Sequence, residues 1–136
     1  MSDTIHSPET AHAEFIAPFL TARFRARYTA LEPGSRFRDE LLNKLCHRFA
    51  EVLDWRFAEG TGDTVADLRR HGAPRNCYCL CFPPELDGRI VPLADALPAL
   101  TGGGAFLLVC QPAALAYFEP EYERGRGQRY MLRLPA

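Results

Sequence analysis

The clearest pattern in the chain is a helical stripe of large apolar residues. They recur at every fourth position, at Phe37, Leu41, Leu45, Phe49 and Leu53. This spacing places them on one face of an α-helix, and Ser35 is a favourable N-cap immediately before the stripe. The pattern therefore predicts a helix of about five turns after Ser35. The intervening polar residues predict a solvent-exposed opposite face that carries Arg38, Asp39, Glu40, Lys44, Arg48 and Glu51.

An earlier helix is predicted over residues 18–31. Ile16, Leu20, Phe24 and Tyr28 stand four positions apart, and the following Pro-Gly pair ends the pattern. The preceding residues lack this periodicity. We therefore expect a flexible lead-in over residues 1–14 and a single domain over residues 15–136.

The second half of the chain reads mainly as strands. Residues 76–82 alternate thiols with large apolar side chains, residues 105–110 are continuously apolar, and residues 115–119 and 130–134 complete two further strands. Short helices are predicted near residues 63–70 and 92–100, and residues 59–63 read as a loop.

This order of elements predicts an α+β fold, because helices dominate the front of the chain and hairpins dominate the back. We expect a mostly antiparallel sheet of three to five strands. The two longer N-terminal helices should pack on one face of it and bury the apolar stripe.

Composition narrows the class of protein. The chain has 136 residues, of which 47% are hydrophobic and 24% charged, as in one compact domain. Its 16 basic and 17 acidic residues argue against a nucleic-acid binder that acts through bulk charge. No apolar run approaches the ~20 residues of a membrane span. The five cysteines are an odd number, and no secretory signal pattern is present, so we expect reduced thiols and a cytoplasmic protein.

The thiols of Cys77, Cys79 and Cys81 should share one face of their strand. Neighbouring thiols on one face lie ~6.5–7 Å apart, which is too far for a disulfide and wide for a tetrahedral metal site. We therefore expect small core residues beneath a helix, with no metal and no cofactor. The alternative is a small enzyme or ligand-binding domain that uses this thiol-lined face or a cleft near Trp55.

No catalytic set stands out in the sequence. The serines are confined to Ser2, Ser7 and Ser35, and no cysteine opens a helix, where its pKa would fall. The glycines at 102–104 follow a helix and precede a strand, which is the wrong order for a phosphate-binding loop. We expect a protein that is not an enzyme.

One strand end has the composition of an interface. Tyrosines, carboxylates and arginines are interleaved there, and such aromatic and guanidinium groups are enriched where proteins meet. The alternative interpretation of this segment is a solvated hairpin loop with no binding role. The candidate partner-binding residues are Tyr117, Glu119, Glu121, Tyr122, Glu123, Arg124 and Arg126.

These observations predict a protein-binding module. The expected partner is another protein, such as a basic toxin or enzyme, rather than nucleic acid or a membrane. The chain would then act as an inhibitor, in the manner of the immunity proteins with which bacteria neutralise toxic enzymes.

Overall fold

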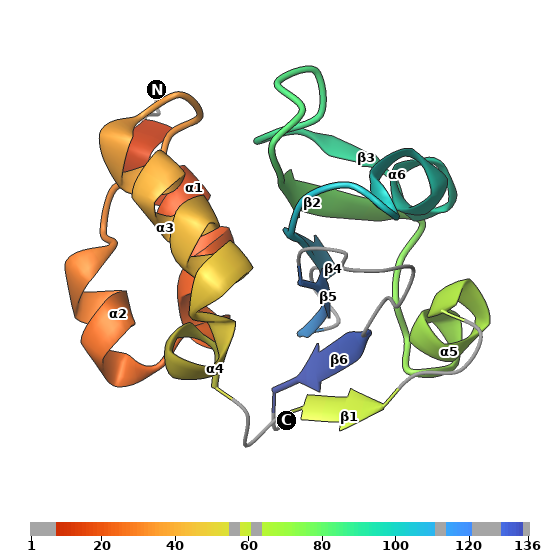
Figure 1. Ribbon diagram of the computed structural model, residues 1–136. Helices are drawn as coiled ribbons and strands as arrows, with labels where there is room; N and C mark the ends of the chain where they lie inside the picture. The colour runs from red at the N-terminus through yellow and green to blue at the C-terminus, as the bar shows by residue number, and fades with distance from the viewer. Residues whose placement is uncertain (1–7, 55–57, 61–63, 111–113, 121–128, 135–136) are drawn as a thin grey trace, which may run out of the picture.

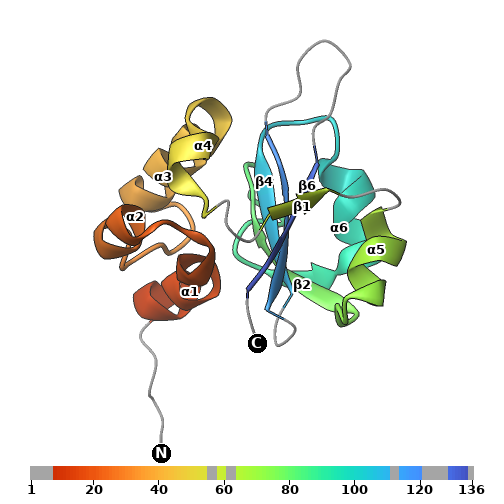
Figure 2. The ribbon, with the colours of Figure 1, turned by 90° about the horizontal axis from the view of Figure 1, so that it is seen from below.

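The computed structural model describes residues 8–54, 58–60, 64–110, 114–120 and 129–134. The described elements form three layers, with a sheet between an N-terminal helical layer and the helices α5 (Thr64–Arg70) and α6 (Leu93–Leu100) (Figures 1 and 2). The predicted α+β class is confirmed. Within the described ranges, no helix combines the length and the apolar character that crossing a membrane requires.

The residues that the structure describes form a sheet of six strands, all joined to their neighbours in antiparallel register. This is one strand more than the upper limit of the expected three to five. Ala58–Gly60 pairs with the last strand, although its sequence is typical of a loop. Backbone pairing here overrides the low strand propensity of Glu and Gly. The strands in spatial order are β1 (Ala58–Gly60), β6 (Tyr130–Arg133), β5 (Leu115–Glu119), β4 (Phe106–Cys110), β2 (Asn76–Leu80) and β3 (Ile90–Pro92).

The helical layer begins earlier than expected and is more broken. Its first helix starts at Pro8, inside the expected lead-in. The sequence pattern does not indicate this helix, because the buried Ala13 is small and adds little to the apolar periodicity. The predicted helix over residues 18–31 is interrupted at Leu20, whose backbone is extended. The elements are α1 (Pro8–Ile16), the 3-10 turn η1 (Ala17–Phe19), α2 (Ala22–Arg27), α3 (Arg36–His47) and α4 (Phe49–Val52).

The long helix α3 is capped as predicted but ends earlier than predicted. Ser35 Oγ accepts a hydrogen bond from the Arg38 backbone N–H at 3.2 Å. The helix stops at Arg48, where φ is −141° and ψ is 33°, and one further turn follows. The expectation of a continuous helix to Leu53 was wrong, because Leu53 adopts an extended backbone that forms a β-bridge with Leu20.

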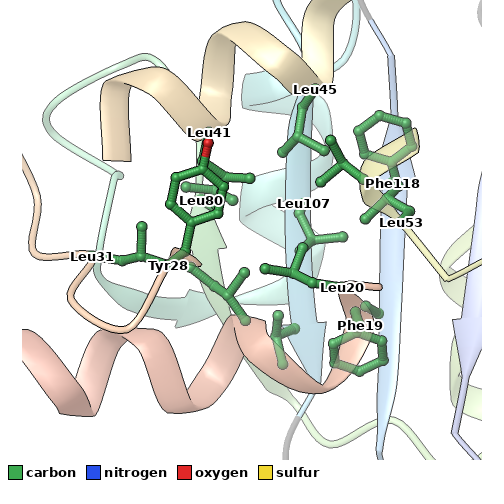
Figure 3. Packing of buried hydrophobic residues seen from close by; sticks show 14 of the residues in the cluster. Phe19, Leu20, Tyr28, Leu31, Leu41, Leu45, Leu53, Leu80, Leu107 and Phe118 are labelled. Atoms are coloured by element: carbon green, nitrogen blue, oxygen red, sulfur yellow. The ribbon is translucent and has the colours of Figure 1, made fainter. Parts of the chain in front are cut away.

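Two apolar cores lie on the two faces of the sheet. On one face, Leu41 and Leu45 of α3 point toward the sheet residues Leu107 and Phe118 (Figure 3). On the other face, α6 covers the thiols of β2 and β4. The predicted alternation of β2 is confirmed, since Tyr78 and Leu80 belong to the first core and Cys77 and Cys79 to the second.

Shortening the fully buried Leu45 tests the first core. We expect Leu45→Ala to lower the free energy of unfolding by about 2–5 kcal/mol, because the substitution leaves a cavity between α3 and the sheet. The exposed Arg36→Ala is the matched control in the same helix, with an expected change within about 0.5 kcal/mol. Urea titration measures both. A Leu45→Ala loss as small as the control's would contradict this packing.

Candidate functional site

A buried arginine joins the helical layer to the sheet. The Arg38 side chain is 0% exposed, and each of its five N–H groups has a partner. Nη1 donates to the Leu31 carbonyl and the Tyr78 hydroxyl, both at 2.7 Å. Nη2 donates to the Cys79 carbonyl at 3.0 Å and to Asp87 at 2.6 Å, and Nε donates to the same carboxylate at 2.9 Å. Arg38 therefore fixes three separate chain segments.

The expectation that Arg38 lies on the solvent face of its helix is wrong, because its side chain is buried. Counted from Arg38, the buried Leu41, Leu42 and Leu45 stand at three, four and seven positions, so all four residues share one helix face. The spacing was visible in the sequence. The large apolar Phe37 pointed instead to the neighbouring face, but it is 43% exposed.

Asp87 is held by the turn between β2 and β3. Its carboxylate also accepts the Cys81 backbone N–H at 3.0 Å, so it binds both Arg38 and the end of β2. The next residue, Gly88, has a φ of +78°, and a Cβ there would lie 2.2 Å from Pro33 Cγ. A glycine is required at this point because the turn lies against the loop before α3.

The polar network continues from Arg38 to the first helix. Tyr78 OH lies 2.8 Å from Nδ1 of His12, and it accepts a hydrogen bond from Arg38 on its other side. The Tyr78 hydroxyl proton is therefore free to be donated to His12. Burial and the positive charge of Arg38 lower the pKa of His12. Burial raises the pKa of Tyr78, against the opposing effect of Arg38.

A hollow opens beside the Tyr78 ring. Tyr78 and Val109 stand opposite each other on β2 and β4 and form its floor, and Ile90, opposite Tyr78 on β3, stands at its rim. Phe15 of α1 forms a wall and stacks on Tyr78, with ring centroids 4.4 Å apart and planes at 3°. The hollow has a volume of about 450 Å³. It lies at the β2–β3 edge of the sheet.

The rim of the hollow combines apolar and cationic groups. Ile90 is 59% exposed, which makes it the most exposed large apolar side chain in the described ranges. Arg75 is exposed at the same rim, and its guanidinium has no ion-pair partner among the described residues. The hollow thus offers an apolar surface beside a positive charge.

Of the residues predicted to bind a partner, the two that the structure describes, Tyr117 and Glu119, do not line this hollow. Tyr117 and Glu119 are 0% and 4% exposed, and the Tyr117 hydroxyl donates to the Glu119 carboxylate, so both belong to the core. The other five predicted residues lie outside the described ranges, at Glu121, Tyr122, Glu123, Arg124 and Arg126. Partner binding at this strand end stays a prediction.

The cysteine strand has the burial that the sequence analysis expected. Cys77, Cys79, Cys81 and Cys110 are each 0–1% exposed. Burial raises the pKa of Cys81 and of Cys110 to about 12, so both are protonated at neutral pH. Trp55, the other feature of the alternative hypothesis, lies outside the described ranges.

Comparison with protein-family models, curated proteins and solved structures finds no match for this chain. Its function must therefore be inferred from the geometry of the hollow and of the polar network behind it.

Replacing the buried guanidinium tests the network. We expect Arg38→Met to lower the free energy of unfolding by about 3–5 kcal/mol, because the partly buried Asp87 carboxylate and two carbonyls lose their donors. The exposed Arg36→Met changes charge and volume equally in the same helix and should stay within about 0.5 kcal/mol. Chemical denaturation compares the two variants. Equal stabilities would show that Arg38 does not hold the layers together.

The lowered pKa of His12 predicts a pH dependence of stability. Its folded pKa lies below the ordinary value of 6.5, so the unfolded chain binds the proton more readily. Stability from neutral His12 is fully present above pH 6.5 and is lost as the pH falls through 6.5 toward the folded pKa. Between about pH 7 and pH 5, wild type should lose more unfolding free energy than His12→Asn, which cannot titrate. Parallel pH profiles would contradict this assignment.

Proposed function

We propose that this chain is a small cytoplasmic protein-binding module of the inhibitor type, like the immunity proteins of bacteria. The observation that carries the proposal is the apolar hollow at the β2–β3 edge with Ile90 on its rim. An exposed apolar side chain next to a concave, partly aromatic surface is typical of a contact that an anchor residue of a partner fills.

The surroundings of the hollow support a preformed contact. The floor residue Tyr78 is fixed by its hydrogen bonds to Arg38 and His12 and by its stacking with Phe15. A surface that is ordered before binding loses less conformational entropy when a partner docks. The hydrogen bonds of Arg38 and His12 to Tyr78 therefore favour binding indirectly, because they hold the floor of the hollow in place.

The backbone of β3 offers a second kind of contact. Cys79 donates its N–H to the Arg89 carbonyl and accepts the Gly88 N–H, so Cys79 directs its backbone groups toward β3. Backbone direction alternates along strands, so Ile90, which stands opposite Tyr78, directs its N–H and C=O to the outer edge of the sheet. A short extended segment could pair there. Pro92 lacks an N–H and limits the pairing to a few residues.

These features define the partner segment chemically. We propose that it is extended, places one aromatic or branched apolar side chain in the hollow, and carries a carboxylate that meets Arg75. The acidic and aromatic residues 121–123 are the second candidate surface, and they would meet a basic region of a partner. A basic toxin or enzyme fits both surfaces. A protein with a net positive charge still carries acidic side chains, and one of them can meet Arg75.

The test is selection of peptides from a displayed random library on the immobilised wild-type chain. We expect enriched peptides to combine an apolar anchor with an acidic residue. Ile90→Lys should weaken their binding about tenfold or more, because it places a charge on the apolar rim, and Arg75→Glu should weaken it through repulsion. Titration calorimetry measures both effects.

Two variants serve as controls for the selected peptides. Arg69→Glu reverses an exposed charge on α5, away from the hollow, and should bind as wild type does. The pair Glu121→Lys and Glu123→Lys should weaken binding only if the second surface is the one used. Unchanged binding by Ile90→Lys, or no enrichment at all, would overturn the hollow as the docking site.

A small organic ligand is the second candidate occupant. A volume of about 450 Å³ is within the size range of small-molecule sites. Titration with a library of aromatic acids, followed by the amide NMR signals of Tyr78 and Val109, separates the two. Saturable shifts with such an acid, together with no enriched peptide, would favour a ligand-binding domain.

A further inference from the structure

Two buried thiols face each other across neighbouring strands, on the side of the sheet opposite the hollow. Tyr78 pairs with Val109, and one step further along the two antiparallel strands Cys77 comes opposite Cys110. Both side chains belong to the core beneath α6, so they point to the same face.

The hydrogen-bond pattern decides how close the two residues come. Because Cys79 directs its backbone groups to β3, Cys77 does so as well, and Tyr78 is the residue that bonds to β4. Cys77 and Cys110 therefore form a non-hydrogen-bonded pair. Such pairs have Cα atoms about 4.5 Å apart, within the range of about 4.4–6.8 Å that a disulfide spans.

The other thiols fit less well. Cys79 lies on the same strand as Cys77. The two thiols are hydrogen-bonded, but the Cα separation of ~6.5–7 Å along a strand is at the upper end of the range that a disulfide spans. Cys79 is diagonal to Cys110, at about 7–8 Å in such sheets. Cys81 lies beyond the last residue of β2. The placement of the strands thus selects one pair from the four buried thiols.

We propose that Cys77 and Cys110 form a reversible disulfide when the chain meets a peroxide. One thiolate attacks a peroxide oxygen, the O–O bond breaks, and a sulfenic acid and hydroxide form. The second thiolate attacks the sulfenic sulfur, the S–S bond forms, and the S–O bond breaks to release a second hydroxide. The two thiol protons convert both hydroxides to water, and the two thiols supply the two electrons that reduce the peroxide.

The reaction is slow at neutral pH and faster at alkaline pH. Burial raises the pKa of Cys110 to about 12, and hydrogen bonding with Cys79 together with burial raises the pKa of Cys77. The attacking species is the thiolate, so both shifts reduce the rate. The disulfide would tie β2 to β4 directly behind Tyr78 and Val109. The floor of the hollow would then be held by a covalent bond.

Peptide mapping tests the proposal on the full chain. Trypsin cleaves after Arg75, Arg89 and Arg124, so the peptide 76–89 contains Cys77 and the peptide 90–124 contains Cys110. After treatment with hydrogen peroxide and alkylation of the remaining thiols, we expect these two peptides to be joined. Fragmentation should place the link between Cys77 and Cys110, and dithiothreitol should abolish it.

Three variants complete the test. Cys110→Ala should abolish the joined peptides, whereas Cys79→Ala and the half-buried control Cys46→Ala should retain them. A link to Cys79 or Cys81, a bridge within the peptide 76–89, or oxidation to sulfinic acid without any link would overturn the proposal. If a variant fails to fold, the fragmentation spectrum of the wild-type link decides by itself.

Discussion

The arrangement of this protein depends on one buried guanidinium. Arg38 reaches from α3 through the first core to the sheet, where it binds the hydroxyl of Tyr78 and the carbonyl of Cys79. Asp87 balances its charge and ties the β2–β3 turn to the same point. A buried charge is unfavourable unless it is paired and all its donors are satisfied, so these partners constrain one another. The relative position of helical layer, strand and turn follows from that requirement.

The hollow is a consequence of this constraint. Arg38 and His12 hold the hydroxyl of Tyr78 on one side, which leaves the ring of Tyr78 to form a floor beside Ile90 and Val109. Phe15 stacks on the ring, and Ile90 on the edge strand remains exposed. Tyr78 thus belongs to both, because its hydroxyl is part of the polar network and its ring is part of the apolar surface. A change in the network therefore alters the shape of the hollow.

The sequence predicted those elements whose pattern is local. The alternation of β2, the apolar run of β4 and the Ser35 cap follow from side-chain spacing, and the structure confirms each. The break at Arg48 and the strand β1 depend on partners far away in sequence, namely Leu20 and β6. The candidate site could not be predicted for the same reason. Asp87 reads as an ordinary turn residue until the fold brings it to Arg38.

The bridge between Leu20 and Leu53 has a separate consequence for the order in which the chain comes apart. Backbone hydrogen bonds from Thr21 to Val52 and from Asp54 to Phe19 flank this bridge and close the segment that contains α2, α3 and α4 on itself. Its two ends are thus joined to each other. A segment closed in this way can open and re-form as one cooperative unit while the sheet remains paired. The helical layer is then a subdomain in the energetic sense, and Arg38, together with the apolar core between α3 and the sheet, couples its stability to that of the sheet.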